Sequence, residues 1–157
     1  EQVTKAVRKV TDKPVIVKLS PNVTDIVEIA KAVEAGGGNG VSLINTLLGM
    51  AIDIHRRKPL LGNIYGGLSG PAVKPVALRM VHQVYKGVNI PIIGLGGIMS
   101  GTDAIEFMMA GAQAVQVGTA TMVDPTAISR IAREMGDYVE RYNLNSITDI
   151  IGAVHQS

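Results

Sequence analysis

The sequence predicts an α/β fold in which parallel strands alternate with helices. Four short apolar runs are each followed by a segment with the apolar spacing of a helix, and this alternation is typical of βα units. Each run ends in residues that can contact a ligand, and the last two end in glycine-rich turns. Since parallel α/β folds bind ligands at the carboxyl ends of their strands, we expect one site along this edge.

The first expected unit is a strand over residues 14–20 and a helix over residues 26–33, preceded by a helical segment over residues 3–10. Lys18 is the one charged residue of this strand. Because successive side chains of a strand alternate between its faces, Lys18 lies opposite the apolar residues at positions 15, 17 and 19. Residues 22–24 offer caps for the helix, and the glycines that follow Ala35 end it.

The later units repeat this order. The remaining expected strands are residues 40–44, 90–95 and 114–117. The helices that follow them run over residues 73–84, from about residue 100 to residue 111, and over residues 128–135. Asp124 is expected to cap the last of these, and Ser146 with Asp149 resembles a capping box for a short terminal helix. The strands are short and apolar, so we expect both of their faces to be buried.

Four βα units fit either a doubly wound sheet or a (β/α)₈ TIM barrel. The glycine-rich ends of the last two strands favour the barrel, because barrels commonly bind phosphate with the loops after strands seven and eight. The units are then strands 5–8, and 157 residues are fewer than the roughly 250 of a whole barrel. We therefore expect residues 1–157 to be a single domain, the C-terminal half of a TIM barrel whose N-terminal half is absent.

Charge and composition limit the possible functions. With 15 Lys and Arg against 13 Asp and Glu, the net charge of +2 is too small and too dispersed for a nucleic-acid-binding surface. The basic cluster at residues 55–58 lies in an expected loop, where a solvated charge run is favoured over a partner contact. The three histidines are scattered, so no metal site is expected.

The chain contains no cysteine, which excludes a disulfide framework, thiolate metal ligands and a cysteine nucleophile within it. It has no apolar stretch near the roughly 20 residues of a membrane span, and residues 1–10 lack a signal-peptide core. We expect a cytoplasmic protein that does not enter a membrane.

Two glycine-rich turns suggest that part of the ligand is a phosphate. Gly96 and Gly97 follow the third strand, and Gly118 with Thr119 follows the fourth. Glycine lets the backbone approach a phosphate closely, and free N–H groups at the following helix can donate to it. The alternative is that these glycines only form tight turns. The spacing does not match the GxGxxG of a dinucleotide-binding site.

The first two strands end in polar groups. Lys18 would project into the barrel mouth, either reaching solvent or stabilising a ligand that gains negative charge. Asn45 and Thr46 follow the second strand, and a turn role is as compatible with them as ligand contact. The segment from Asn45 to Gly70 lacks a helical period, and a loop of this length usually covers a site.

Five motifs in order resemble the C-terminal half of the dihydroorotate dehydrogenases, which are FMN-containing TIM barrels. They are IVKLSPN, GVSLINTLLGMAIDI, GGLSGPAVKPVALRMV, IPIIGLGGI and AVQVGTA. These motifs resemble the NAD-linked, two-subunit type (class IB) more than the fumarate-using cytosolic type. The FMN contacts that it implies are Lys18, Ile44, Gly70, Gly96, Gly97, Gly118 and Thr119. Asn45 and Thr46 match positions that hold the pyrimidine substrate.

The resemblance also implies an activity. The family oxidises dihydroorotate to orotate in de novo pyrimidine biosynthesis, and its catalytic base is a cysteine upstream of the motifs seen here, so no catalytic base is expected in this chain. In the NAD-linked type, electrons pass from FMN to a partner subunit with FAD and a 2Fe–2S cluster and then to NAD. Its catalytic subunits form a homodimer within a heterotetramer.

Two other functions remain open at this point. The chain could belong to another FMN barrel that acts on pyrimidines, such as a dihydropyrimidine dehydrogenase. It could also be a non-catalytic half-barrel that binds phosphate. Because the upstream base and other contacts are missing, we expect the 157-residue fragment alone to be inactive.

Overall fold

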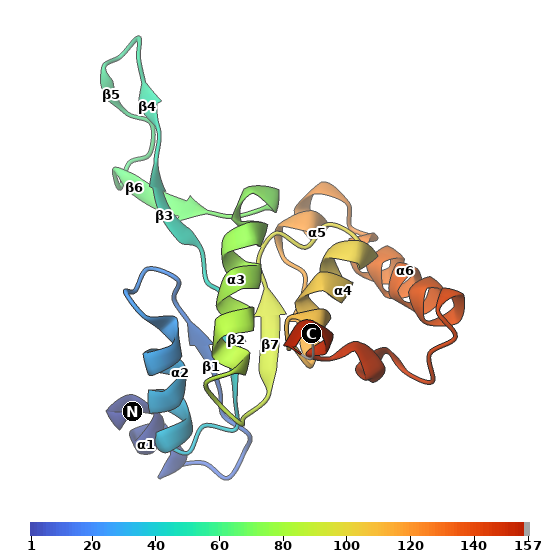
Figure 1. Ribbon diagram of the computed structural model, residues 1–157. Coiled ribbons are helices and arrows are strands. Elements are labelled where there is room, and N and C mark those ends of the chain that lie inside the picture. The colour runs from blue at the N-terminus through green and yellow to red at the C-terminus, as the bar shows by residue number, and fades with distance from the viewer. Residues whose placement is uncertain (156–157) are drawn as a thin grey trace.

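A four-stranded parallel sheet forms the centre of the computed structural model, which describes residues 1–155 (Figure 1). Its strands lie in the order β1 (Ile16–Leu19), β2 (Gly40–Leu43), β7 (Ile92–Leu95) and β8 (Ala114–Gln116). In the register, Lys18 is opposite Ser42, and Leu95 is opposite Gln116. All four predicted strands are therefore confirmed, each slightly shorter than expected.

Helices connect and flank these strands. The α-helices are α1 (Gln2–Arg8), α2 (Ile26–Ala35), α3 (Lys74–Tyr85), α4 (Gly101–Met109), α5 (Thr119–Val123) and α6 (Ala127–Arg141). Three short 3₁₀ helices are η1 (Pro71–Val73), η2 (Ile147–Ile150) and η3 (Ala153–His155). The periodic helices are confirmed, whereas α5 was not expected from the sequence.

The strand order separates the two folds that the sequence left open. In a doubly wound sheet the strand order reverses, and helices cover both faces. Here each strand joins the sheet beside the preceding one, and right-handed crossovers then place the connecting helices on one face. Helices α2, α3 and α4 follow one another across that face (Figure 1). The fold is thus an open half of a (β/α)₈ barrel, as predicted.

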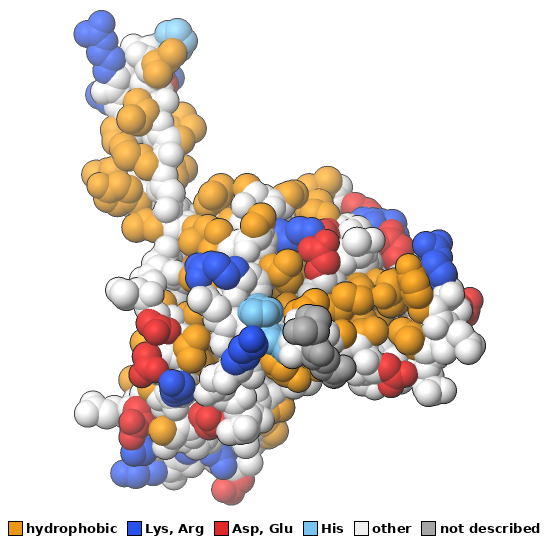
Figure 2. All heavy atoms as spheres, in the orientation of Figure 1, with side chains coloured by type: hydrophobic (Ala, Val, Ile, Leu, Met, Phe, Trp, Pro, Cys, Tyr) orange, Lys and Arg blue, Asp and Glu red, His pale blue; other side chains and the backbone are white. Residues whose placement is uncertain are grey.

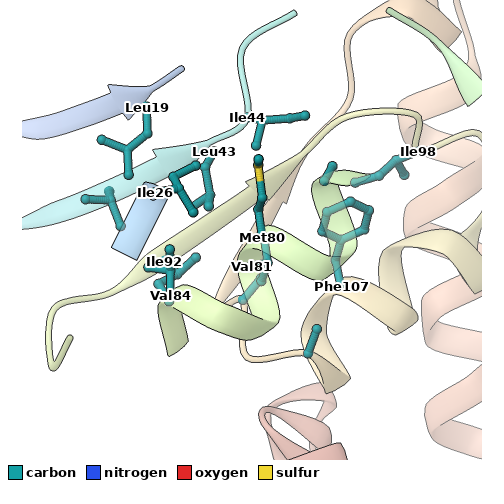
Figure 3. Packing of buried hydrophobic residues seen from close by; sticks show 14 of the residues in the cluster. Leu19, Ile26, Leu43, Ile44, Met80, Val81, Val84, Ile92, Ile98 and Phe107 are labelled. Carbon is teal, nitrogen blue, oxygen red and sulfur yellow. The ribbon is translucent and has the colours of Figure 1, made fainter. Parts of the chain in front are cut away.

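The core lies between this helical layer and the sheet. Leu43 and Ile92 point from the strands toward Val81 and Val84 of α3, and Phe107 of α4 is fully buried beside them (Figure 3). A Cβ atom at Gly94 would lie 2.6 Å from the Phe107 ring, so the ring occupies the space that this glycine leaves. Burying such a side chain contributes about 1.5–3 kcal/mol, and this layer fixes the positions of the strand ends.

The other face of the sheet is less covered than the sequence suggested. Ile16 of β1 is 52% exposed, and Lys18 of the same strand is exposed as well. On β8, Ala114 and Gln116 are also exposed. The expectation that both faces of every strand are buried is therefore wrong for the two outer strands. Within the described residues, helices cover only one face of the sheet.

The segment after β2 forms a β-hairpin arm, which we define as residues 47–68. In this arm β3 (Leu47–Met50) pairs antiparallel with β6 (Tyr65–Leu68), and β4 (Ile52–Asp53) pairs with β5 (Lys58–Pro59). The arm projects away from the sheet, with apolar side chains along it and basic ones at its tip (Figures 1 and 2). The expected loop that covers the site is thus wrong, because cross-strand pairing extends these residues outward.

Two predicted caps are also corrected. The carboxylate of Asp25, rather than residues 22–24, accepts from the first backbone N–H groups of α2. Asp124 does not cap α6 directly, because it binds the N–H and hydroxyl of Thr126, the residue at the N-cap position. The capping box of Ser146 and Asp149 is confirmed.

No helix in residues 1–155 is both long enough and apolar enough to cross a bilayer. The same residues contain no group of three or more His, Asp or Glu side chains placed to hold a metal ion.

Candidate ligand-binding site

One cavity of about 250 Å³ lies at the carboxyl ends of the four parallel strands. The residues that the sequence singled out all line it: Lys18, Ile44, Asn45, Thr46, Gly70, Gly96, Gly97, Gly118 and Thr119. They come from segments up to 101 residues apart, from position 18 to position 119. The parallel order of the sheet brings them together, because it places every carboxyl end on the same edge.

Lys18 provides the charge of this cavity. It extends from β1 on the less covered face of the sheet, while its neighbour Leu19 is buried in the core. Within residues 1–155, no acidic side chain forms an ion pair with it. Among the described residues that line the cavity, Lys18 is the only ionisable one. Its ammonium is therefore available to an anionic or electron-rich ligand.

The backbone after β2 continues the pairing of the sheet on both sides. The Ile44 N–H donates to the Leu95 carbonyl at 2.9 Å, and the Asn45 N–H donates to the Leu19 carbonyl at 3.0 Å. The peptide bond between Leu43 and Ile44 is cis. The two backbone hydrogen bonds fix Ile44 and Asn45 between β1 and β7, next to Lys18.

Asn22 holds the residues that follow. Its side-chain amide donates to the Thr46 carbonyl at 3.0 Å, and its side-chain oxygen accepts from the Leu48 N–H at 3.0 Å. Thr46 also packs closely on Gly67, where an added Cβ atom would lie 2.4 Å from its hydroxyl oxygen. The base of the hairpin arm is thus fixed beside the cavity, although the arm itself points away.

Four glycines border the cavity, and we call Gly70, Gly96, Gly97 and Gly118 the glycine rim. Gly97 has a φ of +76°, in the left-handed region that favours glycine. A Cβ atom there would lie 2.8 Å from the Gly70 carbonyl oxygen. The rim therefore brings the segment before α3 into contact with the loop between β7 and α4.

A cluster of charged side chains joins α3 to α4 next to the loop between β7 and α4. Lys74, at the start of α3, pairs with Asp103 at 2.7 Å and with Glu106 at 2.9 Å, both from α4. Burial alone would raise the pKa of Asp103, but hydrogen bonds from Lys74, Met99 and Ser100 together lower it below its ordinary value. Hydrogen bonds to Asp103 and then to Glu106 raise the pKa of Lys74. Lys74 and Asp103 therefore both stay charged at neutral pH.

A second network approaches the same loop from α6. Arg130 donates to the Met99 carbonyl at 3.2 Å and to Glu134 at 3.0 Å, and Glu134 accepts from the Gly101 N–H. These two hydrogen bonds, first from Gly101 and then from Arg130, lower the pKa of Glu134. The start of α4 is thus fixed from both neighbouring helices.

The rim is more open after β8. Apart from its chain neighbours, a Cβ atom at Gly118 would meet no atom of the described residues within 4 Å. The hydroxyl of Thr119 donates to the hydroxyl of Ser69 at 3.0 Å, which joins the end of β8 to the segment before Gly70. Backbone N–H groups and hydroxyls around the rim can bind an anion such as a phosphate.

Some cavity residues were missed in the sequence. Ser69 lies next to Gly70, and its hydroxyl was visible in the GGLSGPAVKPVALRMV motif. Gln116 could have been found by alternation, since it lies two residues before Gly118 on the face opposite Val115. Met122 belongs to α5, the helix that no sequence pattern indicated.

The arrangement suits an elongated ligand with an anionic end. Lys18 lies on the first strand of the sheet and the open part of the rim follows the last, three strand spacings away, or about 14 Å. The cavity therefore offers a cation at one side and neutral donors at the other. Among the described residues, no carboxylate or histidine lines it.

Comparisons with known proteins identify the family of this chain. A family model described as dihydroorotate dehydrogenase matches residues 1–139. Three similar curated proteins are each named dihydroorotate dehydrogenase B (NAD(+)), catalytic subunit. The protein of Alkaliphilus oremlandii is 63% identical over 152 residues, which cover 97% of this chain and 50% of the relative. The protein of Desulforamulus reducens is 63% identical over 154 residues, which cover 98% of this chain and 51% of the relative.

The third protein, from Geobacter metallireducens, is 64% identical over 152 residues, which cover 97% of this chain and 50% of the relative. The chain thus spans about half the length of the curated relatives it matches. The match to the family model over most of its length shows that the chain belongs to the dihydroorotate dehydrogenase family.

Proposed function

We propose that the intact protein oxidises dihydroorotate to orotate in de novo pyrimidine biosynthesis, with residues 1–157 forming strands 5–8 of its barrel. The observation that supports this most directly is the convergence of the nine predicted residues on one cavity. Membership of the family supports the same reaction. In this proposal the N-terminal half of the barrel covers the exposed face of β1 and β8.

The proposed cofactor is FMN, and the cavity fits its two ends. The phosphate would bind at the glycine rim, where Gly118 leaves open space and the Ser69 and Thr119 hydroxyls line the cavity. The ring would lie toward Lys18 and Ile44, on the other side of the cavity. When bound, FMN would supply the two-electron acceptor for the substrate.

In this proposal Lys18, Asn45 and Thr46 bind and orient. The Lys18 ammonium would stabilise negative charge that develops on the ring, which is the kind of electrostatic effect typically worth about 3 kcal/mol. The amide of Asn45 and the hydroxyl of Thr46 would hold the pyrimidine by hydrogen bonds. The backbone bonds of Ile44 and Asn45 to both neighbouring strands keep these groups in place.

The proton must go to a group outside this chain. The substrate loses a proton together with a hydride, so the reaction needs a general base. Among the described residues, Lys18 is the only ionisable group of the cavity, and the sequence contains no cysteine. We propose that a cysteine from the other half of the protein accepts the proton.

The names of the relatives favour NAD as the final electron acceptor, since each is called an NAD(+) enzyme's catalytic subunit. We propose a partner subunit that carries FAD and a 2Fe–2S cluster, in a heterotetramer built around a homodimer of catalytic subunits. We also propose that this assembly works in the cytoplasm.

A steady-state assay tests the reaction. The intact protein, with its partner subunit, should form orotate from dihydroorotate and NAD and should show the visible absorbance of a flavin. Turnover of uracil without turnover of dihydroorotate would favour a dihydropyrimidine dehydrogenase. Phosphate binding without any turnover would favour a non-catalytic half-barrel, and either result would overturn the proposal.

Replacing Lys18 tests its role. We expect Lys18→Ala to slow flavin reduction by roughly 10²- to 10³-fold, because one charge-stabilising donor is lost. Lys13→Ala is the matched control, since within residues 1–155 Lys13 forms hydrogen bonds only through its backbone and lies outside the cavity. Stopped-flow reduction under anaerobic conditions measures both rates. A Lys18→Ala rate within about twofold of the wild type would contradict this role.

A further inference from the structure

Lys74 is a lysine next to the glycine rim whose charge is already used within the protein. It begins α3 four residues after Gly70, but it does not line the cavity. Its ammonium donates to Asp103 at 2.7 Å and pairs with Glu106 at 2.9 Å. Two carboxylates thus neutralise the ammonium and hold it on α4, away from any ligand at the rim.

Asp103 connects this lysine to the loop that carries Gly96 and Gly97. One carboxylate oxygen accepts from Lys74, and the other accepts from the N–H groups of Met99 and Ser100 at 2.9 and 3.0 Å. The side chains of Lys74 and Asp103 are only 25% and 15% exposed. This ion pair is partly buried, and Asp103 also accepts hydrogen bonds from the loop. Such a pair restricts the positions of the segments that it joins more than an exposed pair does.

Lys74 also contacts the rim directly through its backbone and stem. A Cβ atom at Gly97 would lie 2.8 Å from the Lys74 Cβ and 2.9 Å from the Lys74 nitrogen. The Gly70 carbonyl accepts from the Val73 N–H at 3.1 Å, so the start of α3 also fixes Gly70. Any movement of Lys74 relative to Asp103 would therefore change the distance between Gly70 and Gly97.

We infer that Lys74 and Asp103 are a positioning pair, which holds Gly70 and Gly97 at the separation needed to bind the phosphate of the ligand. The pair does not contact the phosphate itself. This inference rests on the proposed function, because it takes FMN as the ligand. It assigns phosphate recognition at the rim to backbone groups and hydroxyls, with the lysine acting through the loops.

Flavin affinity tests the pair with two variants of the intact protein, Lys74→Met and Asp103→Asn. We expect each to weaken FMN binding about tenfold, the loss expected for one hydrogen bond to a charged group. Binding of riboflavin, which lacks the phosphate, should change less than about twofold. The FMN affinity of the double variant should equal the lower of the two single-variant affinities, because both changes break the same pair.

The sign of the Asp103→Asn effect separates positioning from direct contact. If Lys74 bound the phosphate, removing the opposing carboxylate would free its ammonium and tighten FMN binding, which would overturn the inference. Equal losses for FMN and riboflavin, with a lowered melting temperature, would also overturn it. Lys74→Arg should recover most of the affinity. Lys31→Met and Glu28→Gln, which break an exposed pair on α2, should change neither affinity.

A second readout keeps the two proposals separate. If the wild-type protein binds no FMN, the proposed cofactor is wrong, and amide hydrogen exchange then judges the pair. Faster exchange at Met99 and Ser100 in both variants would support its hold on the loop. Unchanged exchange at these amides would overturn it.

Discussion

The two glycine turns that follow β7 and β8 differ in what surrounds them. After β7, Gly97 has a left-handed φ of +76° and lies against the Gly70 carbonyl and Lys74. After β8, Gly118 has a φ of −113°, and a Cβ atom there would meet nothing else in the described part of the chain within 4 Å. The first turn is packed within the protein, whereas the second is open to the cavity.

This difference gives the two glycines different expected roles. At Gly97, the fold itself excludes a larger side chain, because both the backbone angle and the neighbouring atoms leave no room. At Gly118, the described residues impose no such steric limit, and in the proposed function the phosphate of the ligand takes this space. Substitutions at the two positions should therefore separate stability from binding.

The largest effect is expected from Gly97→Ala. The left-handed backbone costs an alanine about 1–2 kcal/mol, and the contact with the Gly70 oxygen adds to this. We expect the free energy of unfolding to fall by about 3 kcal/mol, measured by urea denaturation. Gly136→Ala is the control. Outside the backbone of its own helix, a Cβ atom at this position would meet no described atom within 4 Å, so the alanine should gain about 0.5–1 kcal/mol. Equal stabilities of Gly97→Ala and the wild type would show that the first turn is not packed.

A smaller and different effect is expected from Gly118→Ala. The added methyl group meets no atom of residues 1–155 beyond its chain neighbours, so the free energy of unfolding should change by less than about 1 kcal/mol. FMN binding should weaken about tenfold, because the methyl group takes space that borders the cavity. Titration calorimetry measures the affinity, and thermal unfolding measures the stability. Unimpaired FMN binding by this variant would remove Gly118 from the proposed phosphate site.

The smallest expected effect is the loss of the stability that Asp103 contributes when the pH is lowered. The pKa of Asp103 is lower in the folded protein than its ordinary value of 3.8. Its contribution to stability is therefore present above that value and is lost as the pH falls through the folded pKa. Lys74, Glu106 and Glu134 are the charged groups around it, and the lysine stays charged throughout this range.

Urea denaturation of the wild type and Asp103→Asn, from neutral pH to below 3.8, measures this contribution. The difference in the free energy of unfolding between the two proteins should shrink as the pH falls. A difference that stays constant over this range would show that the charge of Asp103 does not stabilise the first turn.

Much of the fold could be predicted because its signals are local. The apolar runs, the helical periods and the capping box of Ser146 and Asp149 each depend on neighbouring residues in the chain. The hairpin arm and Asn22 show the limit of such signals. The arm depends on pairing between β3 and β6, and Asn22 bonds to residues more than 20 positions away. Residues 22–24 look like caps locally, but this distant contact assigns Asn22 another role.

The sequence alone indicated which residues end the four strands, and these residues line the cavity because parallel strands present their carboxyl ends on one edge. It also determined the family, through motifs that lie in order along the chain. Only the tertiary structure decided that Gly97 is packed and Gly118 is open, that Ser69 joins Thr119, and that Lys74 is held by Asp103. These features depend on distances between segments that are far apart in the chain, and no local pattern encodes such distances.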